Sequence, residues 1–145
     1  MEALERLLSA FAKRRSARWW IGKRPDVREG QVARAIAGIL SYPTSADDPF
    51  AGGMVRLGKR QAAQVLAVAG TTSLAYEDRP VRQAYVRDAA LALNELGKDA
   101  VFLSNGLWDR RSPLSWTPLT SATFDCGLIA YDAENAFIFW VEEED

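Results

Sequence analysis

The sequence of 145 residues contains no histidine and a single cysteine, Cys126. Without histidine, the commonest general base and the usual zinc ligand are missing, which excludes Ser-His and Cys-His catalysis and zinc-dependent hydrolysis. A lone thiol cannot form an internal disulfide and is typical of a reducing compartment. Cys126 follows Asp125, whose charge raises a thiol pKa, so we expect a buried and unreactive thiol.

Long hydrophobic runs are also missing. The chain never approaches the roughly 18 consecutive apolar residues that a membrane span needs. Charges interrupt residues 1–20, which argues against a secretory signal. Apolar residues make up 48% of the chain and charged residues 26%, a composition typical of globular proteins. We therefore expect one domain spanning residues 1–145, located in the cytoplasm and without a membrane partner.

The spacing of apolar residues predicts an α+β fold. Helices are expected over residues 2–15, 31–40, 59–69 and 81–96. Strands are expected at 54–57, 100–103, 123–131 and 136–142, with a turn or short strand at 17–22. Since helices come first, we predict about four helices packed on a small, mostly antiparallel sheet that ends in a C-terminal β-hairpin.

The last expected strand is apolar on both faces. Two sets of side chains alternate along it: Phe137, Phe139 and Val141, and Ile138 and Trp140. A strand of this kind is usually central in its sheet and covered on both sides. Before it, Asp132–Asn135 is a plausible hairpin loop, in which Asn135 can adopt a positive φ.

Residues 53–59 contain the spacing G-x-x-x-x-G-K of a phosphate-binding loop. A functional loop of this type follows a buried strand and places Ser or Thr after the lysine, but Arg60 stands there and residues 46–51 do not resemble a strand. We therefore reject a nucleotide hydrolase of this type. Because no other catalytic constellation emerges, we expect a non-catalytic protein without cofactor or metal.

Charge is unevenly distributed along the chain. Residues 1–40 carry nine Lys/Arg and four Asp/Glu, whereas residues 121–145 carry seven Asp/Glu and no Lys/Arg. In the segment Arg14–Arg24, basic residues flank Trp19 and Trp20, which suits contact with nucleic acid. The same pattern also fits a solvated helix end followed by core tryptophans. A nucleic-acid-associated regulatory protein is therefore an alternative.

Acidic and aromatic residues gather near the C-terminus. Carboxylates beside exposed tryptophans would suit the basic site of a partner protein. Paired carboxylates could instead hold magnesium in a hydrolase, and the residues after Val141 could be a solvated tail. The predicted partner-binding residues are Trp108, Trp116, Asp132, Glu134, Trp140, Glu142 and Glu143.

The segment Phe124–Asp145 resembles the acidic C-terminal hairpins of some bacterial toxin-immunity proteins. The resemblance implies an intracellular inhibitor that covers the cationic active site of a toxin or effector. On this hypothesis the four carboxylates named above supply charge and the three tryptophans supply anchors.

Overall fold

The structure, a computed structural model, describes residues 1–75, 80–108 and 115–144. Part of the long predicted connection 104–121, namely residues 109–114, and Asp145 of the acidic tail lie outside the described residues. One five-stranded sheet has the order β1-β5-β4-β3-β2, and every neighbouring pair is antiparallel. The strands are β1 (Ala17–Lys23), β2 (Val55–Leu57), β3 (Val101–Ser104), β4 (Phe124–Tyr131) and β5 (Asn135–Glu143).

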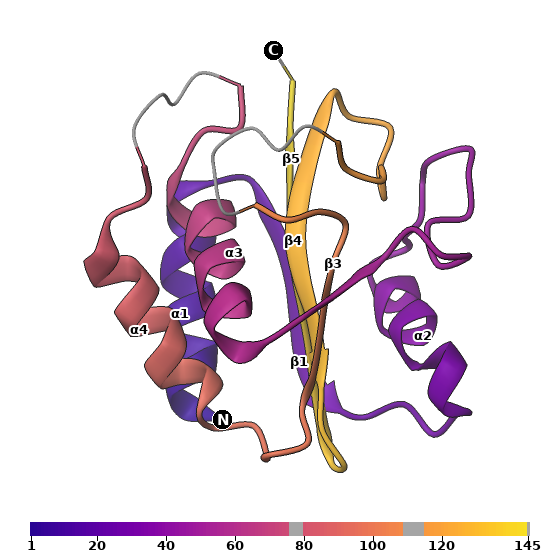
Figure 1. Cartoon of the computed structure of the whole chain (residues 1–145), viewed down its shortest axis with the longest axis horizontal. Coiled ribbons are helices and arrows are strands. Elements are labelled where there is room, and N and C mark those ends of the chain that lie inside the picture. Colours follow the sequence, from indigo (N-terminus) through magenta and orange to yellow (C-terminus); the bar gives the residue numbers. More distant parts are fainter. Residues whose placement is uncertain (76–79, 109–114, 145) are drawn as a thin grey trace.

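The helices cover both faces of the sheet unequally. They are α1 (Glu2–Arg14), α2 (Val32–Ile39), α3 (Lys59–Thr71) and α4 (Gln83–Leu93), with a 3-10 turn, η1 (Glu29–Gln31), before α2. Figure 1 shows α1, α3 and α4 on one side of the sheet and α2 on the other. This arrangement confirms the predicted α+β class and its C-terminal hairpin.

Strand β5 is central, as its two apolar faces predicted. Phe137, Phe139 and Val141 join the larger core beneath α1, α3 and α4. Ile138 and Trp140 join the smaller core beneath α2. β5 lies between β1 and β4, so its backbone is hydrogen-bonded on both edges.

The aromatic stretch after α1 forms a full edge strand rather than a turn. In β1, Trp19 lies opposite Phe139 and Trp20 opposite Ile138, in an antiparallel pair with β5. This pairing places the basic N-terminal segment beside the acidic C-terminal strand. The uneven charge along the chain therefore does not produce two separate charged ends.

The hairpin turn between β4 and β5 depends on Asp132. Its Oδ1 accepts hydrogen bonds from the backbone N–H of Glu134 and Asn135, at 2.8 and 2.7 Å. Asn135 is the first residue of β5, and the positive-φ residues of the described chain are Ser41 and Gly52. The prediction of a positive φ at Asn135 is thus wrong, because a side-chain turn replaces it.

The G-x-x-x-x-G-K segment does not form a loop around an anion. Its middle residues are β2, and Gly58 is the N-cap of α3. An extended strand cannot direct successive N–H groups at one phosphate. The geometry thus agrees with rejection of the phosphate-loop interpretation.

Replacement of Gly127 by alanine should destabilise the fold, because the new Cβ would lie 2.1 Å from the carbonyl oxygen of Phe139 and 2.4 Å from the Trp140 ring. Backbone on a central strand cannot move aside, so we expect a loss of about 3 kcal/mol in unfolding free energy. The matched control is Gly38→Ala in α2, where no atom lies within 4 Å of the new Cβ. That variant should gain about 0.5 kcal/mol. Chemical denaturation of both variants measures the difference, and equal stabilities would contradict the packing described for β4 and β5.

Candidate functional site

The predicted acidic residues occupy opposite ends of β5. Asp132 and Glu134 lie at the hairpin turn, whereas Glu142 and Glu143 lie where the strand ends. β5 is nine residues long, which at a rise of about 3.3 Å per residue separates the two pairs by about 25 Å. These four carboxylates therefore cannot act as one compact surface.

Two of the three predicted tryptophan anchors are core residues. Trp108 and Trp140 are both 0% exposed. The indole N–H of Trp108 donates to Asn105 Oδ1 at 3.1 Å, and that of Trp140 donates to Asp125 Oδ1 at 3.0 Å. The expectation that these side chains are available to a partner is wrong, because each buried indole has its own internal acceptor.

Trp116 is half-buried and belongs to a small aromatic cluster. Its ring stacks on Phe124, with centroids 5.5 Å apart and an interplanar angle of 22°. On its other side it contacts the buried Trp108. Phe124 is itself half-buried and lies opposite Glu143 in the β4–β5 register. The two partly exposed rings therefore lie beside the end of β5.

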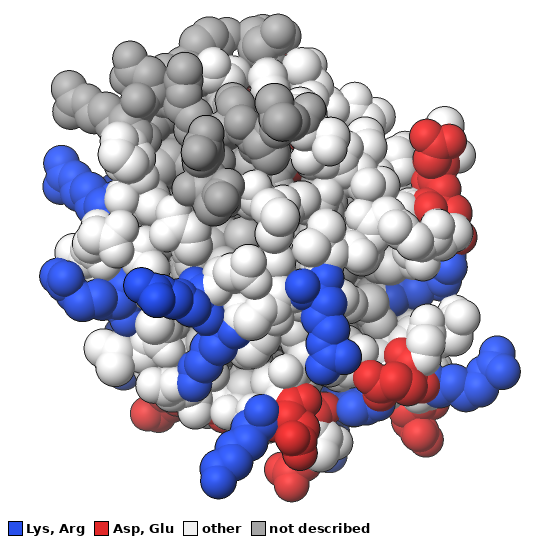
Figure 2. Space-filling view, in the orientation of Figure 1, with Lys and Arg blue, Asp and Glu red and all other residues white. Residues whose placement is uncertain are grey.

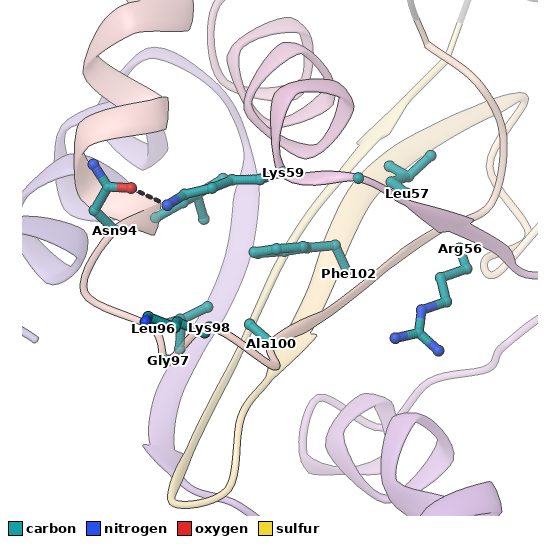
Figure 3. A pocket seen from close by; sticks show the side chains of 11 residues that line it. Arg56, Leu57, Lys59, Asn94, Leu96, Gly97, Lys98, Ala100 and Phe102 are labelled. Atoms are coloured by element: carbon teal, nitrogen blue, oxygen red, sulfur yellow. Dashed lines mark hydrogen bonds between the residues drawn. The ribbon is translucent and has the colours of Figure 1, made fainter.

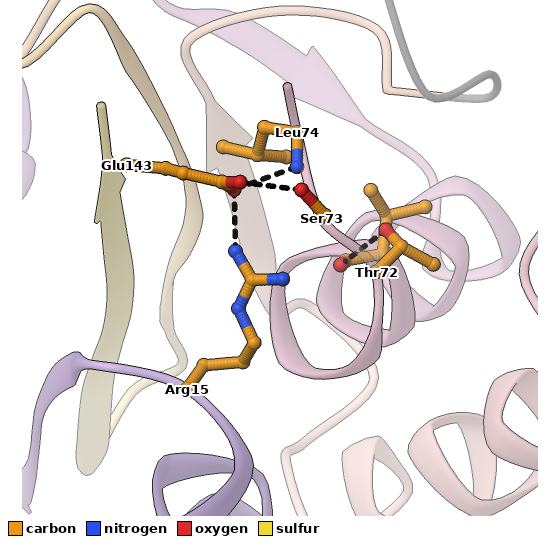
Figure 4. A network of polar contacts seen from close by, with 6 residues as sticks. Arg15, Thr72, Ser73, Leu74 and Glu143 are labelled. Atoms are coloured by element: carbon orange, nitrogen blue, oxygen red, sulfur yellow. Dashed lines mark hydrogen bonds and ion pairs between the residues drawn. The ribbon is translucent and has the colours of Figure 1, made fainter. Parts of the chain in front are cut away.

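Glu143 holds three segments together (Figure 4). Its carboxylate accepts hydrogen bonds from Arg15 Nη2 at 2.5 Å, from the backbone N–H of Leu74 at 2.7 Å and from the Ser73 hydroxyl. Burial acts to raise the pKa of Glu143, but these donors outweigh it and leave the pKa below its usual value. Glu143 thus connects β5 to the end of α1 and to the chain after α3, which is a structural role.

Glu142 points to the opposite face and lines a crevice of about 380 Å³ at the end of the sheet. We call this cavity the C-terminal crevice; its polar and charged lining consists of Ser16, Arg18, Tyr42, Glu142, Glu143 and Glu144. The Tyr42 hydroxyl donates to Glu142 Oε1 at 2.9 Å, and the Arg18 guanidinium lies 5.7 Å from the Tyr42 ring centroid. Burial and the contact with Glu142 raise the pKa of Tyr42, so its hydroxyl remains a donor.

Below the crevice lies the buried carboxylate of Asp125, which is 0% exposed. Its Oδ1 accepts from Asn105 Nδ2, Leu119 N and Trp140 Nε1, at 2.9, 3.1 and 3.0 Å. Its Oδ2 accepts from the backbone N–H and the hydroxyl of Thr120, at 3.3 and 3.2 Å. Burial raises the pKa of Asp125, although the hydrogen bonds from Leu119, Trp140 and Thr120 oppose that effect.

The basic segment of the chain is largely committed to internal contacts. Arg14 donates to the Tyr85 hydroxyl at 2.7 Å, Arg15 pairs with Glu143, and Arg18 lies over Tyr42. Arg24 lies over the Tyr131 ring and pairs with Glu29. Trp19 and Trp20 are half-buried against the two cores. The segment thus fits the solvated-helix-end and core-tryptophan alternative better than a nucleic-acid surface.

Cys126 is buried and free, as predicted. Burial, followed by the charge of Asp125, raises its pKa well above the usual value, so it remains a thiol. Within residues 1–75, 80–108 and 115–144, no group of three or more Cys, Asp or Glu is arranged to hold a metal ion. In the same residues, no helix has the length and apolar character needed to cross a membrane.

Sequence reasoning missed Tyr42, Phe124 and the role of Asp125. A local signal existed for Asp125, because a charged residue in an otherwise apolar strand has to find buried donors. Phe124 starts the same strand, and its register opposite Glu143 follows once the hairpin is aligned. Tyr42 carried no such signal, since its contact with Glu142 spans 100 residues of chain.

Replacement of Asp125 by alanine should lower the unfolding free energy by about 3 kcal/mol or more, because several buried donors lose their acceptor together. Asp88→Ala on the exposed face of α4 is the control, with an expected change within about 0.5 kcal/mol. Urea denaturation followed by tryptophan fluorescence measures both. If the two variants were equally stable, the carboxylate would not hold the connection to the sheet.

Glu143→Gln should weaken the fold at neutral pH and flatten its pH dependence in acid. The folded-state pKa of Glu143 is lowered, so its stabilisation is present above the unfolded-state pKa and is lost as the pH falls through the folded value. Thermal unfolding of both proteins across a pH series should therefore show curves that converge at low pH. A constant difference at every pH would contradict the ionic contribution.

Comparison with known proteins adds no assignment to this geometry. No family model, no curated protein and no solved structure matches the chain.

Proposed function

We propose that this chain is a non-catalytic protein-binding protein that holds a basic partner at the end of its central hairpin. The observation that carries the proposal is that the stacked Trp116–Phe124 pair and the C-terminal crevice both lie at the same end of β5, on opposite faces of the sheet. Partly exposed aromatic rings and several carboxylates are thereby brought to the same end of the sheet. In this role the chain would be an inhibitor, as the resemblance to toxin-immunity proteins implies.

The chemistry of this region suits a partner with Lys or Arg side chains. Tryptophan is among the residues that most often dominate binding energy in protein interfaces. Carboxylates around it attract a basic surface and increase the rate of encounter. Glu142 retains an oxygen beyond the one bonded to Tyr42, and Glu144 is exposed and bonded to Thr123. Both glutamates can therefore accept hydrogen bonds from a partner without losing their internal contacts.

The proposal changes the composition of the predicted surface. Trp116 and Glu142 are retained as contact residues, and Phe124, Tyr42 and Glu144 are added. Glu143 supports the surface from within, since its carboxylate is already bonded to Arg15, Ser73 and Leu74. Trp108 and Trp140 are core residues, and Asp132 and Glu134 belong to the far end of the hairpin.

A toxin whose active site binds an anionic substrate is the partner class that best fits such a surface. Its active site is cationic, so a crevice lined by glutamates would occupy it in place of the substrate. Because toxins of this class act inside cells, an inhibitor of this kind would work in the cytoplasm. These assignments rest on charge complementarity and on the resemblance given above.

The test is an affinity capture from the native cells with matched variants of the tagged chain. We expect one dominant protein with wild type and at least about tenfold less of it with Trp116→Ala or with the double variant Glu142→Gln, Glu144→Gln. The double variant keeps hydrogen-bond acceptors but removes charge, so its residual binding should also depend less on salt.

Leu91→Ala is the control, since Leu91 is 68% exposed on α4 and lies outside the crevice. It should capture the partner as wild type does, and circular dichroism should show all variants folded. The captured protein, once purified, should lose its activity when mixed with the chain. Equal capture by every variant, or recovery of nucleic acid alone, would refute the proposal.

A further inference from the structure

A larger cavity, of about 760 Å³, lies at the other end of the molecule, next to the hairpin turn. Its wall is formed by the junction between β2 and α3 and by the connection from α4 to β3 (Figure 3). We call it the basic cavity. The side chains that matter for its chemistry are Arg56, Leu57, Lys59, Leu96, Lys98 and Phe102.

The lining of the basic cavity has three cations and no carboxylate. The ammonium group of Lys59 reaches across to the amide oxygen of Asn94, a neutral acceptor that leaves its charge uncompensated. Lys98 is exposed and forms no ion pair within the described chain. Figure 2 shows Lys and Arg side chains across the middle of this face. The cavity therefore has a positive potential.

Nearby carboxylates are occupied elsewhere. Asp132 accepts a hydrogen bond from the backbone N–H of Gly97 at 2.8 Å and otherwise serves the hairpin turn. Glu95 accepts from the backbone N–H groups of Ala3 and Leu4 at the start of α1. Neither carboxylate lines the cavity, and neither forms an ion pair with its lysines.

The floor of the cavity is apolar. Leu57, Leu96 and Phe102 are between 4 and 6% exposed. A mixture of apolar floor and a few convergent polar groups, at this volume, is typical of small-molecule sites. The lysines lie on one side of Phe102, whereas Arg56 extends on the other (Figure 3). An anionic group would thus bind between Lys59 and Lys98, with an apolar portion against Phe102.

The start of α3 adds to this potential. Gly58 is the N-cap and has no side chain, and its backbone N–H donates to Gln61 Oε1 at 3.1 Å. Apart from its chain neighbours, a Cβ at Gly58 would have only Gln61 Oε1 within 4 Å, at 3.9 Å, so no bulky side chain packs over this turn. The positive end of a helix of 13 residues favours an anion there, in addition to the lysine charges.

We propose that the basic cavity binds a small phosphate-bearing molecule of about nucleotide size. The phosphate is held by Lys59 and Lys98, and a flat apolar group rests on Phe102. This site shares Gly58 and Lys59 with the sequence pattern of a phosphate-binding loop, yet it binds through side chains on two elements rather than through an enclosing loop. It is independent of the C-terminal crevice and of any protein partner.

The experiment titrates the isotope-labelled chain with adenosine 5′-monophosphate, adenosine and inorganic phosphate, followed by NMR. We expect saturable shifts of the Gly58, Lys59, Gly97 and Lys98 amides with the nucleotide, at a Kd of about 1 mM or tighter. Inorganic phosphate should shift the same amides more weakly, and adenosine should bind at least about tenfold more weakly than the nucleotide.

The double variant Lys59→Ala, Lys98→Ala should weaken nucleotide binding at least about tenfold, because two charge-assisted contacts are lost. Both side chains are exposed, so the variant should remain folded. Arg87→Ala removes an exposed cation of α4 that does not line the cavity, and it should bind as wild type does. Absence of saturable shifts, equal binding of nucleotide and adenosine, or unchanged affinity in the double variant would each overturn the proposal.

Discussion

The hydrogen bonds to the buried carboxylate of Asp125 are the constraint on which the rest of the structure depends. A carboxylate with no exposed surface and no paired cation is costly unless donors surround it. Here the donors come from the connection after β3, from residues 119–120 and from β5. The carbonyl oxygen of Leu119 in turn accepts hydrogen bonds from the backbone N–H groups of Thr44 and Ser45. The hydrogen-bond network of Asp125 therefore extends to the layer around α2. One charge thereby connects residues 105 and 119–120 to the sheet, and it lies opposite Glu142 of the C-terminal crevice in the β4–β5 register.

The structural features that depend on the local pattern of apolar residues could be predicted from the sequence. The helices, the hairpin and the central position of β5 follow from apolar periods of 3.6 and 2, which neighbouring residues determine. The pairing of β1 with β5 does not follow, because Trp19 and Phe139 meet across most of the chain. Once that pair forms, Arg15 and Arg24 come close to the carboxylates and carbonyls of the C-terminal hairpin. Two charge excesses that look separate in the sequence therefore compensate each other in space.

The site was harder to predict than the fold, for physical reasons. A tryptophan in a polar connection looks exposed, yet Trp108 is buried because Asn105, three residues earlier, supplies an acceptor for its indole N–H. An acidic residue looks available to a ligand from its type alone. The carboxylate of Asp132, however, already accepts hydrogen bonds within its own turn and from Gly97, and that of Glu143 accepts them from three donors. The partners of these groups, not their types, determine whether they face a ligand. Among the predicted residues that the structure describes, Trp116, Glu134 and Glu142 retain exposure and unused hydrogen-bonding capacity, but Glu134 lies at the far end of the hairpin.

Charged side chains that have no internal partner of opposite charge can bind a ligand. Several arginines of the described chain lie over an aromatic ring or against a carboxylate, as Arg14, Arg18 and Arg34 do. Among the charges of the described residues that have no ion pair, two groups lie at cavities: Glu142 and Glu144, and Lys59 and Lys98. The length of β5 separates these places by about 25 Å, and their charges are opposite. A basic partner at the crevice would thus be repelled from the basic cavity, and a phosphate-bearing ligand would be repelled from the crevice. The two sites can therefore be occupied together, and each is protected by charge from the ligand of the other.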